Sequence, residues 1–374
     1  MKIQFIDLRA QQKRLKNDID LGIQNVLNHG KYIMGPEVKD FEKNLANFGN
    51  AKHALGCANG TDALLLALLA WNIGPGDAVF CPSFTYCATA EVVANVGATP
   101  IFIDINRGTY NIDPESLKKA IKEVKDTNTL TPRAIIAVDL FGQCADYPSL
   151  YAIAKANGLK LMSDSAQGFG TTMNGHHPLN WADIATTSFF PAKPLGCYGD
   201  GGAVLTNNDK LASTIDSLRV HGKGSDKYDN VRVGVNSRLD TIQAAILLPK
   251  LAIFSEEIKA RNVVAKRYID SLEGIGLRVP KVAEGVISTW AQFTIEVPNP
   301  EIFSDKLKKA GIPTARYYPK PIHHQSAYNH YPIAGGYLKN TEECIKHIIS
   351  LPMHPYLDKE TQDMIIEETK KSLA

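Results

Sequence analysis

Short apolar runs and helix-like segments alternate between residues 51 and 206, and this alternation limits the possible folds more than any other feature. The apolar runs are HALGCA, DAVFCP, TPIFIDI, AIIAVDLF, LKLMSD, IATTSFF and GGAVLTN. Several of them are separated by segments with helical periodicity, namely TDALLLALLAWN, YCATAEVVANVG, PESLKKAIKEV and YPSLYAIAKANG. Such alternation is typical of α/β units around a mainly parallel sheet. Ligands bind beside the carboxyl ends of the strands in these sheets, so functional residues are expected there.

The chain after residue 240 has a different pattern. Residues 240–275 have a long apolar periodicity that predicts helix, with a break or kink at Pro249. The following segments predict a strand over 288–297, a helix that stops at a glycine over 301–313, and a strand leading into a loop over 314–328.

A chain of 374 residues has room for two domains. We expect a large α/β domain over residues 1–250, which includes the N-terminal segment, and a smaller α+β domain over residues 251–374. The formal net charge of +2 gives no indication of a nucleic-acid or membrane partner. The N-terminus has no apolar core of a secretory signal, and the apolar stretch Ala63–Trp71 is too short to span a bilayer. We therefore expect a cytoplasmic protein.

The six cysteines are scattered, and no pair has C-x-x-C or another zinc-binding spacing. This distribution is typical of reduced cytosolic thiols that fill a core. No metal site is expected from the sequence.

Lys193 lies in the segment SFFPAKPLGCYGDGGAV, between Pro191 and Pro194 and before a run of glycines. Pro194 favours an extended backbone at Lys193, and the glycines let the chain turn close to a ligand. A lysine held in such a frame is suited to nucleophilic attack on a bound carbonyl compound once it is deprotonated. The alternative is a surface lysine in a turn, and this segment alone does not decide between them.

Asp164 follows directly after the apolar run LKLMSD, 29 positions before Lys193, with one further predicted strand between them. A carboxylate at the end of a strand can pair with a cationic ring nitrogen, as in a pyridoxal phosphate site, where the protonated ring draws in electrons. The alternative is an aspartate that caps the next turn.

Three further positions suit a phosphorylated, flat ligand. Gly60 and Thr61 open a strongly apolar helix, whose N-terminal amides and dipole favour a phosphate. The alternative is an ordinary cap by Asn59 or Thr61, which does not exclude phosphate binding. Ser188 can reach the same phosphate or only end a strand. Tyr86 can cover a flat cofactor or pack in the core.

Together these segments resemble the DegT/StrS-type sugar aminotransferases, which are pyridoxal phosphate enzymes of fold type I. The resemblance covers nearly the whole chain and rests on ANGTDAL, SFTYCATAE, DSAQGFG, TSFFPAKPLGCYGDGGAV and RVGVNSRLDTIQAAIL. The lysine segment followed by GDGGA is highly specific, and ANGTDAL is less so. The resemblance implies a large domain with a mainly parallel mixed sheet and a smaller C-terminal domain. IQFIDLRAQQ, GKYIMGPEV and SLPMHPYLD are similar to a subgroup that acts on UDP-linked 3-oxo uronates.

The resemblance also implies roles for the residues of a cofactor site. Lys193 would form an imine with pyridoxal phosphate, Asp164 would pair with the pyridine nitrogen, and Gln167 would lie near the phenolic oxygen. Tyr86 would stack on the ring. The residues that would hold the phosphate are Gly60, Thr61 and Ser188.

Other residues are implied in subunit and substrate contacts. Asn236 would reach the phosphate of a partner subunit, which implies a homodimer, although it can also be a plain turn residue. Arg238 would grip a substrate carboxylate with two hydrogen bonds, or form an ion pair with Asp240. Tyr317 and Tyr318 would shape the sugar end of the site. The family pattern implies a histidine at position 317, so this departure puts the sugar in doubt.

The implied reaction moves the amino group of L-glutamate to a UDP-linked keto-sugar for a surface polysaccharide such as O-antigen. Two readings of another class remain. The first is a sugar dehydratase on the same fold. Related dehydratases have histidine in place of the lysine, so the presence of Lys193 argues against this reading. A non-catalytic regulatory protein on the same fold would show no cofactor turnover.

Overall fold

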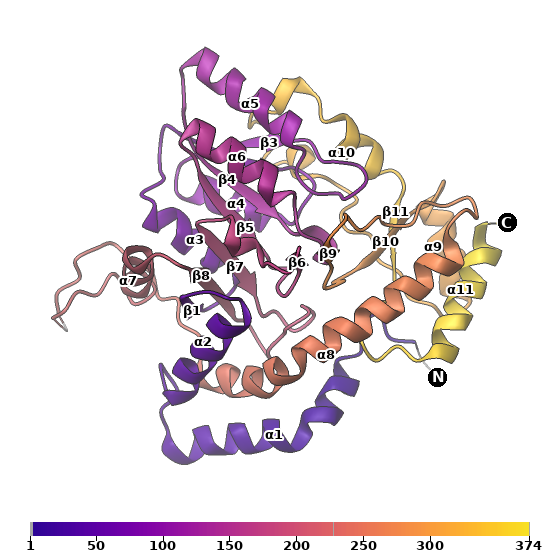
Figure 1. The fold of residues 1–374 in the computed structure, drawn as a ribbon, viewed down its shortest axis with the longest axis horizontal. Coiled ribbons are helices and arrows are strands. Elements are labelled where there is room, and N and C mark those ends of the chain that lie inside the picture. Colours follow the sequence, from indigo (N-terminus) through magenta and orange to yellow (C-terminus); the bar gives the residue numbers. More distant parts are fainter. Residues whose placement is uncertain (1–2, 227, 374) are drawn as a thin grey trace.

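A seven-stranded mixed sheet forms the centre of the molecule (Figure 1) in a computed structural model that describes residues 3–226 and 228–373. Its strands, in chain order, are β1 (His53–Cys57), β2 (Asp77–Pro82), β3 (Thr99–Ile103), β4 (Thr131–Val138), β5 (Lys160–Asp164), β7 (Ile184–Ser188) and β8 (Gly202–Thr206). The spatial order is β1-β8-β7-β5-β4-β2-β3, and only β8 is antiparallel to its neighbours. The predicted α/β class and all seven predicted strands are confirmed.

Helices cover both faces of this sheet. One face carries α3 (Gly60–Ala70), α4 (Ala88–Asn95) and α7 (Asp209–Leu218), and α3 contacts both of the others. The other face carries α5 (Pro114–Thr127), α6 (Tyr147–Asn157), α2 (Pro36–Phe48) and α8 (Thr241–Leu272), and α1 (Leu8–His29) packs along α8 (Figure 1). Because side chains of a strand alternate between faces, Val204 of β8 lies in the core that includes residues of α3 and α7. Ala203 and Leu205 lie in the core that includes residues of α2 and α8.

α8 runs without interruption from Thr241 to Leu272 and contains Pro249, so the predicted break at this proline is wrong. A proline inside a helix removes one backbone hydrogen bond, but packing against α1 and α2 holds the helix on both sides of it. α8 also reaches a further core, where Tyr268 and Leu272 meet elements of the C-terminal unit. The predicted domain border at 250/251 falls inside α8 and stays a prediction.

Part of the C-terminal segment builds a smaller α+β unit (Figure 1), whereas Ile322, Ala334 and Leu338 pack into the core of the large sheet. Its two-stranded antiparallel sheet pairs β10 (Phe293–Glu296) with β11 (Ile348–Leu351). α9 (Pro300–Lys309) and α11 (Lys359–Leu373) pack against each other, and α10 (Lys339–Cys344) precedes β11. The short strands β6 (Thr172–Met173) and β9 (Val286–Ile287) form a separate pair. The remaining elements are short 3₁₀ helices: η1 (Leu140–Gly142), η2 (Pro178–Asn180), η3 (Ile322–His324) and η4 (Ala334–Gly336).

The strand predicted within residues 314–328 is wrong. A single bridge between Ala315 and Ser350 is followed by irregular backbone and η3, with a cis peptide bond between Tyr317 and Tyr318. Pro319 and Pro321 cannot donate ladder hydrogen bonds, which explains why strand pairing stops here. Among the helices of residues 3–226 and 228–373, none is long and apolar enough to cross a membrane.

Candidate active site

Asp164 and Lys193 come together at the carboxyl edge of the sheet. Asp164 is the last residue of β5, which pairs with β7, and Lys193 lies on the loop from β7 to β8. Asp164 is buried and accepts hydrogen bonds from Thr89 Oγ1 (2.9 Å) and the Ala166 amide (3.2 Å). Burial raises the pKa of Asp164, and the positive charge of Lys193 opposes this shift. The two groups are therefore close enough to interact electrostatically, as the sequence predicted.

The Lys193 side chain is half-buried, and burial lowers its pKa while the charge of Asp164 opposes the shift. Within the part of the chain that the structure describes, no hydrogen bond or ion pair holds its Nζ. The loop around it is fixed by its own backbone, because the Lys193 amide donates to Phe190 O at 2.8 Å. At Gly196 a side chain would lie 2.4 Å from Pro191 O, so only glycine fits. A free amine with a lowered pKa on a fixed loop is suited to nucleophilic chemistry.

A tight cradle forms where α3 begins beside the end of β7. A Cβ on Gly60 would lie 2.6 Å from Ser188 Cβ, and a Cβ on Gly202 would lie 2.4 Å from Asn59 O. Asn59 is the N-cap and accepts a hydrogen bond from the Asp62 amide at 2.8 Å. The earlier amides of the helix, at Gly60 and Thr61, have no partner within the helix and are available to an anion. The cap by Asn59 therefore does not exclude the binding of an anion by these amides.

Gln167, Tyr318 and Tyr86 lie near one another. Gln167 is buried; its Nε2 donates to the Tyr318 hydroxyl at 3.2 Å, and its Oε1 accepts from the Phe141 amide at 2.9 Å. The ring centroids of Tyr86 and Tyr318 are 6.3 Å apart. Tyr86 is 54% exposed, which excludes the alternative that it simply packs in the core. Its ring is free to cover a flat ligand.

Tyr317 is half-buried, with its ring 5.7 Å from that of Tyr318 and 6.3 Å from that of Phe5. The N-terminal segment therefore reaches the region where the sequence places the sugar end of the site.

Asn236 and Arg238 lie on the loop between α7 and α8, on either side of Ser237, whose hydroxyl accepts a hydrogen bond from the Ala58 amide at 3.2 Å. This loop extends away from the body of the molecule (Figure 1). Asn236 is exposed, and its backbone bridges to Val220. Arg238 is half-buried, and in the described residues it forms no ion pair with Asp240 or any other acid. Within residues 3–226 and 228–373, both side chains are thus left without a hydrogen-bond or ion-pair partner.

Sequence reasoning missed two residues that support this site. Thr89, which holds Asp164, lies one helical turn after Tyr86 in SFTYCATAE, and that spacing was a usable signal. Lys250 is almost fully buried, donates from Nζ to Gly196 O at 2.6 Å, and lies 4.3 Å from the Tyr198 ring centroid. A lysine inside the apolar run AAILLPKLAIF was the signal for it.

This arrangement fits pyridoxal phosphate. The cradle at Gly60 offers amides to a phosphate, the buried carboxylate of Asp164 suits a cationic ring nitrogen, and the amine of Lys193 suits an aldehyde. The three features face one edge of the sheet, as the binding of one elongated ligand requires.

Comparison with known proteins agrees with this geometry. Residues 13–370 match the model of the DegT/DnrJ/EryC1/StrS aminotransferase family. UDP-2-acetamido-2-deoxy-3-oxo-D-glucuronate aminotransferase of Pseudomonas aeruginosa is 50% identical over 95% of this chain and 96% of the relative. The crystal structure of a DegT DnrJ EryC1 StrS aminotransferase from Brucella abortus has a TM-score of 0.97 and 48% identity over 99% of both chains. The structure of NtdA from Bacillus subtilis with bound cofactor PMP has a TM-score of 0.90 and 31% identity, covering 100% of this chain and 85% of that one.

Proposed function

The chain belongs to the DegT/DnrJ/EryC1/StrS aminotransferase family, and from this premise we propose that it transfers the amino group of L-glutamate to C3 of UDP-2-acetamido-2-deoxy-3-oxo-D-glucuronate. It is a pyridoxal phosphate-dependent nucleotide-sugar aminotransferase. The observation that carries the proposed reaction is the unpartnered, half-buried Lys193 facing the charge of buried Asp164. The amino sugar would serve the synthesis of a surface polysaccharide such as the O-antigen of lipopolysaccharide, in the cytoplasm.

Pyridoxal phosphate, when bound, supplies an aldehyde that takes up an amino group and a ring that accepts electrons from the adjacent carbon. In the proposed roles, the Lys193 Nζ first holds the cofactor and then, once displaced by glutamate, takes the proton from the substrate Cα. Its lowered pKa keeps a larger fraction of the amine neutral and ready to accept that proton. The same nitrogen delivers a proton when the keto-sugar is aminated.

Asp164 is proposed to hold the ring nitrogen in its protonated form. A buried carboxylate with a raised pKa is poorly solvated, so a cation beside it is favoured more than in water. Thr89 and the Ala166 amide orient the carboxylate, which fixes the direction of this hydrogen bond. Gln167 can donate its second amide hydrogen to the phenolic oxygen, since its other polar groups are engaged.

The proposed phosphate site consists of the α3 amides at Gly60 and Thr61 and the hydroxyl of Ser188. Tyr86 would cover one face of the ring. A Cβ on Gly60 would lie 3.1 Å from Ser188 Oγ, so the glycine lets the serine hydroxyl come close to the first amides of α3.

A homodimer is proposed because, in the described residues of one chain, the side chains of Asn236 and Arg238 form no hydrogen bond or ion pair. Both lie on a loop whose Val231 and Val233 are 53% and 95% exposed, which is unfavourable for apolar side chains in water. A cavity of about 660 Å³ lies beneath the same loop and is lined by residues including Asp216 and Arg232. A partner subunit covering this loop would bury the valines and receive Asn236 at its phosphate site. Arg238 would then grip the carboxylate of glutamate or of the uronate.

A second candidate is a related nucleotide-linked keto-sugar aminated at C3 or C4. Tyr317, where the family pattern implies histidine, favours this candidate because it belongs to the proposed sugar end of the site. The reaction and the role of Lys193 would be unchanged.

Amine transfer from L-glutamate to a panel of UDP- and dTDP-linked keto-sugars tests the proposal. We expect 2-oxoglutarate release and amination of the 3-oxo-glucuronate substrate. Lys193→Ala should slow both half-reactions by at least about 10²-fold, because a positioned proton-transfer group contributes about that much. Lys210→Ala, an exposed lysine on α7, is the matched control. Wild-type rates in Lys193→Ala would refute the mechanism, and an unchanged visible spectrum of the wild type with glutamate would favour a regulatory protein.

A further inference from the structure

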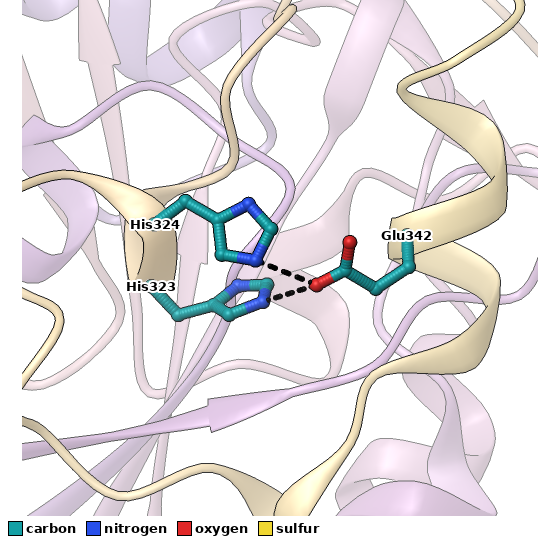
Figure 2. A group of neighbouring side chains, drawn as sticks. All are labelled: His323, His324 and Glu342. Carbon is teal, nitrogen blue, oxygen red and sulfur yellow. Dashed lines mark hydrogen bonds and ion pairs between the residues drawn. The ribbon is translucent and has the colours of Figure 1, made fainter.

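His323, His324 and Glu342 point their polar atoms toward one point outside the cofactor site (Figure 2). The Nε2 atoms of His323 and His324 lie 2.9 and 2.8 Å from the same oxygen, Oε1 of Glu342. All three donor atoms lie within 4.8 Å of one another. Because two imidazole nitrogens converge on one carboxylate oxygen, this cluster differs from a simple ion pair.

The rest of the fold holds these three side chains in place independently of each other. Ser83, directly after β2, accepts a hydrogen bond from the His323 amide at 3.1 Å, and its hydroxyl lies 2.6 Å from His323 Nδ1. Asp104, directly after the neighbouring strand β3, accepts from the amide and hydroxyl of Thr341, both at 2.8 Å. The ends of two paired strands therefore fix η3 and α10, and the cluster does not depend on its own hydrogen bonds.

The surroundings suit an ion that enters from solvent. The side chain of His323 is 4% exposed, that of Glu342 is 16% exposed and that of His324 is 43% exposed. In the tautomer whose Nδ1 donates to Ser83 Oγ, the lone pair of Nε2 is available to an ion bound between His323 and Glu342. A hydrogen bond to the second ring nitrogen is the usual way in which proteins orient a metal-binding histidine.

We propose that His323, His324 and Glu342 bind a divalent transition-metal ion of the zinc class, with water in the fourth position. Two imidazoles and one carboxylate are a ligand set that zinc favours. Bonds of about 2.0–2.1 Å in a tetrahedral site hold ligand atoms about 3.4 Å apart, so the 2.8 and 2.9 Å separations need to open only slightly. Any protons carried by the imidazoles are released to solvent as the ion binds.

The role of the site would be structural rather than catalytic, because the ion would join η3 to α10. η3 follows a few residues after Tyr317 and Tyr318, and the ring of Tyr318 lies near that of Tyr86. Binding would stiffen the segment proposed to form the sugar end of the site. This inference is independent of the proposed substrate, because it depends only on the three side chains and their anchors.

Metal analysis of the cofactor-loaded protein tests the proposal. After incubation with Zn²⁺ and gel filtration, we expect stoichiometric zinc in the wild type, and an anomalous scattering peak between the three side chains in zinc-soaked crystals. His324→Asn and Glu342→Gln should each weaken zinc binding by at least about tenfold in a chelator competition, since ligand loss costs no less than loss of an outer-shell partner. His330→Asn is the control, because His330 is exposed in the same segment.

Because the His324 side chain is 43% exposed, we expect its replacement to leave the core unchanged, and retention of the cofactor absorbance verifies folding. Two results would overturn the site. One is wild-type protein that elutes without zinc, which would leave the three residues as a hydrogen-bonded group only. The other is His324→Asn protein that binds zinc as tightly as wild type, which would place the ion elsewhere.

Discussion

Lys250 is a buried lysine that holds the loop between β7 and β8 through a hydrogen bond to Gly196 O. Burial lowers its pKa from 10.5 to about 8, a cost of roughly 3 kcal/mol for the charged form. Its charged hydrogen bond to Gly196 O and its contact with the Tyr198 ring return about the same amount. We therefore expect a small net effect on stability, while the hydrogen bond to Gly196 O fixes the loop that carries Lys193.

We predict that Lys250→Met changes the free energy of unfolding by less than about 1 kcal/mol, since the two contributions offset each other. The loss of the anchor at Gly196 should slow the half-reaction with glutamate about tenfold, with little change in KM. Urea denaturation and single-turnover kinetics measure these effects. Lys259→Met, an exposed lysine on the same helix, is the control. A wild-type rate in Lys250→Met would exclude the positioning role.

His354 predicts a pH dependence of stability. It is buried between β11 and α11, and burial together with the charge of Arg261 lowers its pKa to about 4. The unfolded chain binds a proton near pH 6.5 and the folded chain does not, so stability is full above pH 6.5 and is lost as the pH falls toward 4. The loss amounts to about 3 kcal/mol.

Denaturant unfolding at several pH values, compared between wild type and His354→Gln, isolates this residue. We expect a shallower slope between pH 6.5 and 4 in the variant, whatever its absolute stability. The comparison is needed because burial also lowers the pKa of His177 and His323. Parallel curves for the two proteins would show that His354 does not cause the dependence.

At the scale of elements, the contact between α1 and α8 compensates for Pro249. The proline cannot donate to Ala245 O, the carbonyl four residues earlier, and this carbonyl lies against Gly22 of α1. A Cβ on Gly22 would lie 3.2 Å from that oxygen. The glycine thus allows the two helices to approach where one backbone hydrogen bond is missing.

Gly22→Val is predicted to lower the free energy of unfolding by about 1–3 kcal/mol, because the larger side chain forces α1 away from α8. Leu21→Val introduces the same residue on the exposed face of α1 and should have little effect. Urea denaturation of both variants measures the difference. Equal stabilities would show that the close approach at Gly22 contributes nothing.

The elements that the sequence predicted well are those whose neighbours are close in the chain. Buried parallel strands such as β5 are continuous apolar runs that end at a polar residue, Asp164, so both strand and site residue were visible. The predicted break at Pro249 was wrong because its helix is held by α1, more than 200 positions away in sequence. The predicted strand within residues 314–328 was wrong because the tyrosines of this segment favour a strand while its prolines prevent one.

For the whole molecule, the proposed sharing of active sites predicts complementation between two inactive variants. Lys193→Ala lacks the amine and Asn236→Ala lacks the residue proposed to reach the partner. When the two chains are co-expressed, mixed dimers contain one complete site of two, so about a quarter of the wild-type activity should return. Sedimentation confirms the dimer, and co-expression of two Lys193→Ala chains is the control. No recovered activity, or an active Asn236→Ala protein, would contradict shared sites.

Sequence reasoning found the parts of the candidate site that lie on motifs, and it missed the parts that depend on distant packing. Gly60, Asp164 and Ser188 stand at helix or strand ends and could be recognised there. The contact of Lys250 with Gly196 joins residues 54 positions apart, and that of Ser83 with His323 joins residues 240 positions apart. Such partners become visible only once the chain has folded.

The uninterrupted helix α8 contributes to a core beside the large sheet and to the core of the C-terminal unit, and it is about 48 Å long at 1.5 Å per residue. If the C-terminal unit moves relative to the large sheet, α8 must bend, because the helix belongs to the cores of both parts. Bending is easiest where the ladder of main-chain bonds has a gap, at residue 249, one position from the lysine that steadies the catalytic loop. A movement of the C-terminal unit would then also affect the hydrogen bond by which Lys250 holds the loop at Gly196.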